Sequence, residues 1–349
     1  MPDIITTAVA AIGIDLGDED SHYACINDDG DIIEEARIAM KPAVFKRTFS
    51  SFEPTRFAIE AGAQSRWVAK LLEELGHEVI VANPRQLALI TANNNKNDKN
   101  DAKLLARLAR VDATLLNPLK HRSEELQTTL LAIRARAQLV KTRVALMHSL
   151  RGMVKCFGTR LPHSTSESFL ERCRASVPEA LLKQLDGLFT MIHELTKQIE
   201  AYDELIETIA RDQYPAVQIL TSVPGVGTLT ALTFVTTMAD PERFDHSRDA
   251  GAFLGLRPRQ QQSGKQNPQL GITKAGDVYL RKLLVQSAHC TLQTYTPDSA
   301  LKRWGLKLCE RGGANAKKRA IVAVARKLAV LLHRMWKDQA IYRPFPSAA

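Results

Sequence analysis

Four carboxylates occur where strands end or a helix begins, and their spacing is suited to holding a metal ion. Asp15 ends an apolar run in GIDLG, and Glu60 ends another in AIEAG. Asp98 and Asp101 are three residues apart at the start of a predicted helix, which puts both on nearly the same helix face. Oxygen ligands suit Mg²⁺ or Mn²⁺, and a metal pair about 4 Å apart stabilises both the attacking and the leaving oxygen of a phosphodiester. The spacing therefore predicts a catalytic metal site made by these four residues.

Each acid also has a simpler interpretation. A single acid in such a place is more often solvated or a helix cap than a metal ligand, and Asp98 and Asp101 would favour a helix N-terminus electrostatically. Three neighbouring acids, Asp18, Glu19 and Asp20, are interpreted as loop residues. GIDLG is also compatible with the phosphate-binding hairpin of an actin-like ATPase or sugar kinase, but the second glycine-rich phosphate turn that such an enzyme needs is missing. The set of four is more specific than any of its members.

The elements that must position these acids alternate between strand and helix in the first third of the chain. The predicted strands lie at 8–16, 56–62 and 77–84. The segment 21–39 predicts a β-hairpin, because two strand-like runs flank Asn-Asp-Asp-Gly. Helices are predicted at 64–75 and 101–110. A β-hairpin followed by αβα is what an RNase H-like fold looks like in sequence.

The middle third is predicted to be helical. Apolar residues step by alternating four and three residues in two stretches, which is the period of a coiled-coil seam. The seams comprise Leu126, Leu130, Ile133, Ala137, Val140, Val144 and Met147, and then Leu181, Leu185, Leu188, Ile192, Leu195, Ile199, Tyr202, Ile206 and Ile209. The alternative is two ordinary helices in a bundle, and Gly187 inside the second stretch weakens a regular coil. The pattern predicts a coiled coil through which the chain forms a homo-oligomer, a dimer or a tetramer.

The last third combines a glycine turn with a long polar loop. VPGVG lies between two predicted helices and resembles a helix-hairpin-helix, in which the amides of Gly225 and Gly227 would face a nucleic-acid phosphate. A tight helix–helix turn without a ligand explains the motif equally well. A loop rich in Gly, Arg, Gln and Ser follows at 255–276, and helices are predicted at 277–292 and 316–338.

Charge is unevenly placed along the chain. The net charge over 349 residues is +9. Residues 1–36 hold ten acids and no Lys or Arg, whereas 120–160 hold nine basic residues and 302–337 hold eleven. The two basic segments contain only two acids and one acid, respectively. They are therefore predicted to contact nucleic-acid phosphates.

Several classes of protein are disfavoured by composition. No apolar run reaches the roughly 18 residues that a membrane span needs, and residues 1–20 lack the basic start and apolar stretch of a signal peptide. The five cysteines are scattered, odd in number and without a CxxC pair, which argues against a disulfide framework and a cysteine-ligated zinc site. We therefore expect a protein of a reducing cytoplasm.

Two blocks of sequence resemble IS110-family transposases. GIDLG with Asp15, IEAG with Glu60, and KNDKNDAKLLARL with Asp98 and Asp101 resemble the family's DEDD domain. TSVPGVGTLTALTFVTTM and AGAFLGLRPRQQQSGKQNPQLGITKAGDVYLRKLLVQSA resemble its second domain. The blocks follow the family's order and cover most of the chain.

The resemblance implies a bacterial, nucleoid-associated insertion-sequence recombinase that acts on double-stranded donor and target DNA. Its parts would be a RuvC-like metal-binding domain (1–119), a coiled-coil region (120–212) and a mostly helical transposase domain (213–349). The family's nucleophilic serine falls on Ser263, in PRQQQSGK. A noncoding guide RNA from the element would select the DNA partners.

Ser263 lies among residues that suit phosphoryl transfer. A serine hydroxyl is a weak nucleophile that needs a base or metal nearby, and positive charge stabilises the transition state. The basic residues around it in sequence are Arg257, Arg259, Lys265, Lys274 and Arg281. Gly264 would let a backbone approach the scissile phosphate closely. Without the resemblance, Ser263 would be one polar residue in a basic loop.

Two other functions stay open. A RuvC-like nuclease would hydrolyse branched DNA with water and use the C-terminal domain only for binding. A nucleic-acid-binding scaffold would need none of the four acids. Tyrosine recombination is disfavoured, because none of the six tyrosines lies in a suitable Arg/His setting.

Overall fold

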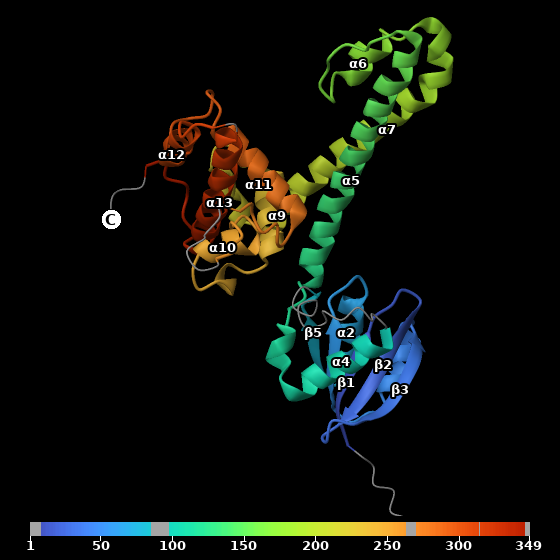
Figure 1. The fold of residues 1–349 in the computed structure, drawn as a ribbon. Helices are drawn as coiled ribbons and strands as arrows, with labels where there is room; N and C mark the ends of the chain where they lie inside the picture. The colour runs from blue at the N-terminus through green and yellow to red at the C-terminus, as the bar shows by residue number, and fades with distance from the viewer. Residues whose placement is uncertain (1–7, 85–97, 263–269, 314, 346–349) are drawn as a thin grey trace, which may run out of the picture. The chain divides into compact units, whose positions relative to one another are not determined.

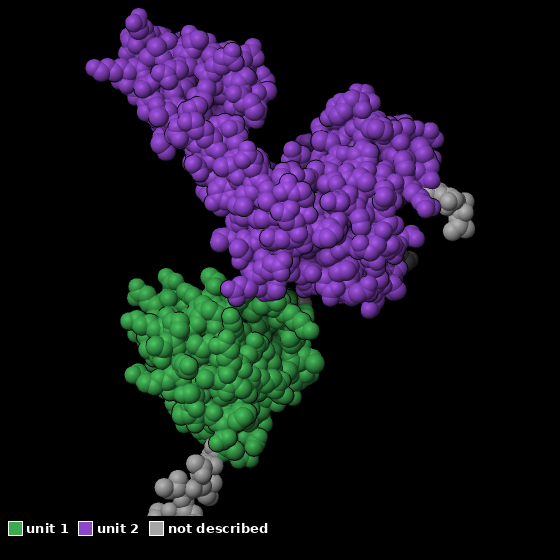
Figure 2. All heavy atoms as spheres, turned by 180° about the vertical axis from the view of Figure 1, so that it is seen from behind, with its two compact units in different colours: residues 1–121 green, residues 122–349 purple. Residues whose placement is uncertain are grey.

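The computed structural model describes residues 8–84, 98–262, 270–313 and 315–345. The chain divides into two compact units, residues 1–121 (unit 1) and 122–349 (unit 2), as Figure 2 shows. Unit 1 is a mixed α/β structure built on one sheet, and unit 2 is helical (Figure 1). Within the described ranges, every helix is too short or too polar to cross a lipid bilayer.

Five strands form the sheet of unit 1 in the order β3-β2-β1-β4-β5. They are β1 (Val9–Asp15), β2 (Asp20–Asn27), β3 (Ile32–Ala39), β4 (Arg56–Glu60) and β5 (Glu78–Ala82). The first three are antiparallel neighbours, whereas β4 runs parallel to β1 and β5 runs parallel to β4. The predicted hairpin at 21–39 is confirmed as β2 and β3. The order and sense of the strands are consistent with the predicted RNase H-like, or RuvC-like, fold.

Helices cover both faces of this sheet (Figure 1). They are α1 (Pro42–Phe49), α2 (Ser65–Glu74) and α4 (Asp98–Val111), followed by the 3-10 helix η1 (Ala113–Leu116). α4 packs Leu105 and Ala109 into the core on one face, while α1 packs Phe45 and Phe49 into the core on the other. α1 is not predicted from sequence, and α4 begins at Asp98, three residues before the predicted start.

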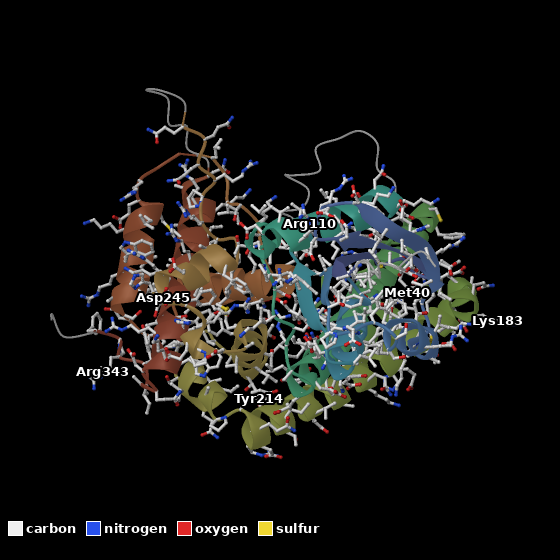
Figure 3. The ribbon with its side chains drawn as sticks, turned by 90° about the horizontal axis from the view of Figure 1, so that it is seen from below. Met40, Arg110, Lys183, Tyr214, Asp245 and Arg343 are labelled. Atoms are coloured by element: carbon white, nitrogen blue, oxygen red, sulfur yellow. The ribbon has the colours of Figure 1, made fainter. Side chains whose placement is uncertain are left out.

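Polar contacts fasten α4 to the hairpin strands. Lys103 forms an ion pair with Glu35 of β3, with 2.8 Å between Nζ and Oε1. Arg110, labelled in Figure 3, donates from Nη1 to the carbonyl oxygen of Asp28 at 2.7 Å, in the turn that joins β2 to β3. Both the middle and the C-terminal end of α4 are therefore held against the sheet.

Two long helices pair in unit 2. They are α5 (Glu124–Met153) and α7 (Glu179–Gln213). Arg136 makes two hydrogen bonds to the Asp203 carboxylate, at 2.8 and 3.0 Å. Thr129 lies 3.1 Å from the hydroxyl of Tyr214, which is labelled in Figure 3. The contact of α5 moves from Tyr214 back to Asp203 as the chain advances from Thr129 to Arg136, so the two helices are antiparallel. The predicted seams therefore pack within one chain, and both supercoiling and association between chains stay predictions.

The remaining helices make a body at one end of this pair, while η2 and α6 lie at the other end (Figure 1). The bounds are η2 (Val154–Phe157), α6 (Phe169–Arg174), α8 (Ala216–Thr221), α9 (Thr228–Met238), η3 (Pro241–Arg243), α10 (Arg248–Phe253), α11 (Val278–Thr291), α12 (Ala300–Cys309) and α13 (Ala316–Lys337). α9 is central, since every residue from 230 to 238 is buried. Its Thr233 and Thr236 donate their hydroxyl protons to carbonyls one turn back, which satisfies them without an outside partner.

The core of the body also takes apolar side chains from the long helices. Ile133 of α5 and Ile206 of α7 belong to the same buried cluster as Phe234 of α9. The predicted boundary between 212 and 213 therefore falls inside unit 2, and the division of the chain into three domains stays a prediction.

Candidate active site and nucleic-acid interface

One pocket in unit 1 is lined by acidic side chains from three separate stretches of the chain. The four predicted ligands, Asp15, Glu60, Asp98 and Asp101, all line it. Asp18, which is interpreted from sequence as a loop acid, lines it too. The other lining residues are Leu16, Gly17, Ala61, Gly62, Ala63 and Gln64.

Strand pairing explains why two of these acids are neighbours. Asp15 is the last residue of β1, and Glu60 is the last residue of β4. The two strands are parallel, with Ile14 opposite Ile59. The carboxyl ends of parallel strands lie at the same edge of a sheet, and open α/β sheets bind ligands there.

Gly13 allows α4 to bring the other two acids to the same edge. A Cβ atom at this position would overlap the carbonyl oxygen of Ala102 and the backbone nitrogen of Ala106. The main chain of β1 therefore touches the main chain of α4. Asp98 and Asp101 lie in the first turn of α4, and this contact places that turn close to the end of β1.

Two tight turns complete the wall of the pocket. The backbone amide of Gly17 donates to Ser21 Oγ at 3.2 Å, and a Cβ on Gly17 would overlap the carbonyl oxygen of Asp20, so the turn that carries Asp18 has no room for a side chain at Gly17. After β4, the Gly62 amide donates to Ser65 Oγ at 3.1 Å, and the Ser65 hydroxyl donates to the Gly62 carbonyl at 2.8 Å. These bonds fix the turn between Glu60 and α2.

The donor set fits a hard divalent cation, because every ionisable group that lines the pocket is a carboxylate. Among the described residues, no group of three or more Asp, Glu, His or Cys side chains is arranged to hold a metal ion. Direct coordination by the four acids therefore remains a proposal.

The second candidate region is the loop at 255–276, whose two limbs pair. The amide of Arg259 donates to the carbonyl of Gly271, and the amide of Thr273 donates to the carbonyl of Arg257, both at 2.9 Å. Ser263 and Lys265 lie outside the described residues. The structure therefore describes how the loop that carries the predicted nucleophile is built at its base.

The base of this loop depends on left-handed backbone. Gly255, Lys274 and Gly276 have φ angles of +67°, +56° and +69°. A Cβ on Gly255 would overlap the backbone of Ala275, and one on Gly276 would overlap the carbonyl oxygen of Phe253. Only glycine fits at the two outer positions, so both limbs start in one defined direction.

The predicted phosphate contacts in this region have different surroundings. Arg281 donates from Nη1 to the carbonyls of Leu254 and Ala275, at 3.0 and 2.6 Å, so it braces the loop. Arg257 and Arg259 are exposed. Lys274 is exposed as well.

The start of α11 is tied both to the loop base and to α5. Asp277 caps α11 by accepting from the Leu280 amide at 2.8 Å. The same carboxylate forms an ion pair with Arg134 of α5 at 2.5 Å. This pair connects the end of the loop to the long helices.

The glycine turn packs against α11. Gly225 has a φ of +90°, and a Cβ there would lie 3.1 Å from the Ser287 carbonyl oxygen and 3.2 Å from Cys290 Cβ. This contact supports the interpretation of Gly225 as a helix–helix turn. A Cβ on Gly227 would meet nothing within 4 Å, and its contact with a phosphate stays a prediction.

α13 presents a basic surface. Its exposed cations are Lys317, Lys318, Arg319, Arg326, Lys327 and Arg334, and the helix contains no acid. The Lys327 ammonium lies 4.4 Å from the centre of the Trp304 ring. Arg319 and Arg326 have no ion pair within the described part of the chain.

An acidic pocket at the carboxyl ends of parallel strands, in a chain that also carries a basic helical surface, is typical of metal-dependent enzymes that cut nucleic acid. The family model described as "Transposase", with a DEDD domain, matches residues 12–157, and the model "Transposase IS116/IS110/IS902 family" matches residues 217–303. The chain belongs to the IS110 family of insertion-sequence transposases, enzymes that cleave and rejoin DNA. Their DEDD domain depends on divalent metal ions.

Relatives match over most of the chain. The transposase of insertion sequence element IS1328 from Yersinia enterocolitica is 31% identical, over 92% of this chain and 95% of the relative. The transposase of element IS1111A from Coxiella burnetii is 29% identical, over 96% of this chain and 92% of the relative. The pilin gene-inverting protein of Moraxella lacunata is 26% identical, over 77% of this chain and 74% of that protein.

Two residues with polar side chains that line the acidic pocket, Asp18 and Gln64, are not among the site residues predicted from sequence. Asp18 follows Gly17 in the turn after β1, and Gln64 immediately precedes α2. Both residues belong to turns, where no spacing pattern in the sequence reveals the direction of a side chain.

Proposed function

We propose that the chain cuts and rejoins DNA by attack of the Ser263 hydroxyl on a phosphodiester. Asp15, Glu60, Asp98 and Asp101 would hold Mg²⁺ or Mn²⁺, which lowers the barrier by neutralising charge on the phosphate oxygens. The Ser263 Oγ–P bond forms while one P–O bond to a deoxyribose breaks. A base takes up the serine proton, and the leaving deoxyribose oxygen takes up a proton and stays as a free hydroxyl at the cleaved strand end. A DNA hydroxyl from the new partner then attacks the phosphoserine, which restores the serine and seals the strand.

The acidic pocket is the observation that supports this proposal most. Four acids chosen from sequence, separated by as many as 86 positions, line one pocket. Parallel pairing of β1 with β4 and the close contact of Gly13 with α4 account for the convergence.

The loop base supports the serine half of the proposal. Paired limbs and two obligatory glycines give the described base of the loop a defined conformation. A fixed base would lower the entropic cost of bringing the Ser263 hydroxyl to a phosphate.

A covalent adduct distinguishes serine chemistry from hydrolysis. Full-length chain is incubated with DNA of its element end, the element's RNA and Mg²⁺, and then denatured. We expect a protein–DNA adduct that disappears in Ser263→Ala and in the near-isosteric variants Asp15→Asn, Glu60→Gln, Asp98→Asn and Asp101→Asn. EDTA should abolish the adduct, and added Mg²⁺ or Mn²⁺ should restore it. Normal adduct yield in Ser263→Ala would contradict the assignment of the nucleophile.

A metal-dependent nuclease that uses water is the second candidate. One observation favours it, since every residue that lines the acidic pocket belongs to unit 1. This function predicts that Ser263→Ala cuts branched DNA at the wild-type rate without an adduct, and that the four acid variants do not cut.

We also propose that the basic face of α13 binds phosphates of a noncoding guide RNA. The exposed cations and the absence of acids on this helix support it. Replacing Arg319 and Arg326 together by Gln should weaken RNA binding and reduce the slope of log K against log salt by about 0.7 to 0.9 for each lost contact. Arg303→Gln is the control, because Arg303 already pairs with Asp298. An unchanged slope in the double variant would remove α13 from the interface.

Association between chains through the long helices belongs to the same proposal. Leu131 of α5 and Leu205 of α7 are exposed apolar residues on this pair, at 68% and 45%. Light scattering on the wild type and on Leu131→Glu tests it, and an equal mass for the two proteins would exclude this surface.

Because the relatives are bacterial, we place the reaction in the cytoplasm, at the nucleoid.

A further inference from the structure

Gln64 lines the acidic pocket, and its side chain is held by a neighbour. It is the residue just before α2, but its side chain makes no capping hydrogen bond to the helix. Trp67 Nε1 donates instead to Gln64 Oε1 at 2.7 Å. The turn itself is held by Ser65 and Gly62, so it does not depend on the Gln64 amide.

The indole fixes which way the amide faces. An indole N–H only donates, so the atom that receives it must be the amide oxygen. The indole is itself positioned, because its ring lies edge-on to Phe45 with 5.2 Å between the ring centres. Within the described ranges, the Gln64 NH₂ group makes no hydrogen bond. The side chain is thus an oriented donor with both of its N–H groups available.

A donor of this kind is unusual among the groups that line the pocket. The five acidic side chains can accept hydrogen bonds or bind cations, but when ionised they cannot donate. The Gln64 nitrogen has no basic lone pair for a metal, and its neutral oxygen, which accepts from Trp67, attracts a cation less strongly than the ionised carboxylates do. The two N–H groups can bind the anionic oxygens that a cation attracts.

We propose that Gln64 contacts the substrate by donating a hydrogen bond to a non-bridging oxygen of the DNA phosphate held at this pocket, and that Trp67 positions it. The proposal rests on the function proposed above, in which the acidic pocket carries out metal-assisted cleavage. A metal site made by Asp15, Glu60, Asp98 and Asp101 does not itself require the Gln64 amide, so the role of Gln64 is an additional inference.

Three variants separate the donor from the shape of the side chain. Gln64→Met keeps the length and removes the donor, and single-turnover cleavage should slow by about 10- to 100-fold, the loss expected for a hydrogen bond to a charged group. Gln64→Glu can still accept from Trp67 but adds a negative charge, so it should be slower still. Trp67→Phe keeps an aromatic ring against Phe45 and frees the amide, which should cost less than Gln64→Met.

Sulfur substitution at the scissile phosphate supplies a readout that a structural role would not change. One phosphorothioate diastereomer should slow the wild type in both Mg²⁺ and Mn²⁺, because sulfur accepts a hydrogen bond poorly and Mn²⁺ does not replace that bond. In Gln64→Met the slowing by this diastereomer should vanish. A slowing by sulfur that persists at full size in Gln64→Met would overturn the proposal.

Measurements of metal binding distinguish a wrong role for Gln64 from a failure of the proposed function. Titration with Mn²⁺ should give wild-type affinity for Gln64→Met and weaker binding for Asp15→Asn. If Asp15→Asn binds Mn²⁺ and cleaves like the wild type, the metal site itself is misassigned. If Asp15→Asn is inactive but Gln64→Met cleaves at the wild-type rate, only the role of Gln64 is wrong.

Discussion

Gly13 determines how closely α4 approaches β1, and through that contact the spacing of the acids. Its missing side chain leaves the backbone atoms of Ala102 and Ala106 in the space that a Cβ would occupy. A glycine in GIDLG therefore has a packing reason that is independent of phosphate binding.

Replacing Gly13 by Ala should lower the free energy of unfolding of unit 1 by about 3 kcal/mol, because either β1 or α4 must move. The displacement should also raise the Mn²⁺ concentration needed for cleavage. Chemical denaturation and a metal titration measure the two effects. Gly62→Ala is the matched control, since a Cβ there meets nothing within 4 Å and lies at the same pocket. Equal stability of the two variants would contradict the packing argument.

His333 should make unit 2 sensitive to acid. It is fully buried on α13, with Nδ1 3.0 Å from Ser247 Oγ, and burial, together with the nearby Lys337 ammonium, lowers its pKa below the usual 6.5. The unfolded chain therefore binds a proton at a pH where the folded chain does not. Stability from this group is complete above pH 6.5 and is lost as the pH falls through the lowered pKa, by at most about 1.4 kcal/mol per pH unit.

Thermal unfolding between pH 7 and pH 5 checks this expectation. The melting temperature of unit 2 should fall more in the wild type than in His333→Leu, which has no group to protonate there. Parallel decreases in the two proteins would show that His333 does not cause the acid sensitivity.

At the scale of elements, the conformation of the loop at 255–276 depends on the glycines at its base. Gly276→Ala places a methyl group against the Phe253 carbonyl at a φ that alanine adopts poorly, at a cost of about 2 kcal/mol or more. We expect the serine adduct to fall by at least about tenfold, the effect of a misplaced reacting group. Gly271→Ala lies in the same loop with nothing within 4 Å and should keep wild-type yield. Similar adduct yields from the two variants would show that the conformation of the loop base does not affect attack by the serine.

Elements with a clear period or turn signal were predicted from sequence, and others were not. The hairpin of β2 and β3 follows from Asn-Asp-Asp-Gly between strand-like runs. The antiparallel pairing of α5 with α7 does not follow from their seams, because a heptad pattern states that a helix has a partner and not which helix it is. α1 spans only eight residues, too few for a helical period to stand out, although Phe45 and Phe49 are spaced by one turn.

The candidate site was predictable only in part, because only some of its residues lie in elements with a clear sequence pattern. Acids at the ends of apolar runs are visible in sequence, because a strand end has a pattern. Asp18 and Gln64 belong to turns, where the direction of a side chain depends on hydrogen bonds such as those of Ser21 and Trp67. No spacing rule reveals those bonds before the fold is known.

At the scale of the whole molecule, each unit has its own apolar cores. The two buried clusters of the sheet draw only on unit 1, and the two helical clusters draw only on unit 2. A chain built in this way should unfold in two steps.

Scanning calorimetry should therefore resolve two transitions. Gly13→Ala should lower only the transition of unit 1. Phe234→Ala, which removes a fully buried ring from α9, should lower only the transition of unit 2, through a loss of about 3 to 5 kcal/mol. A single transition that both variants shift would show that the units unfold together.

The contact between β1 and α4 has a consequence for how this chain can change over many generations. Two main chains that touch do so whatever side chains surround them, so drift among the apolar residues of unit 1 need not alter the distance between the strand end and the helix start. A library that randomises Leu105, Phe57 and Leu72 among apolar residues but retains Gly13 should thus yield many active members. One that retains those three and varies Gly13 should yield almost none.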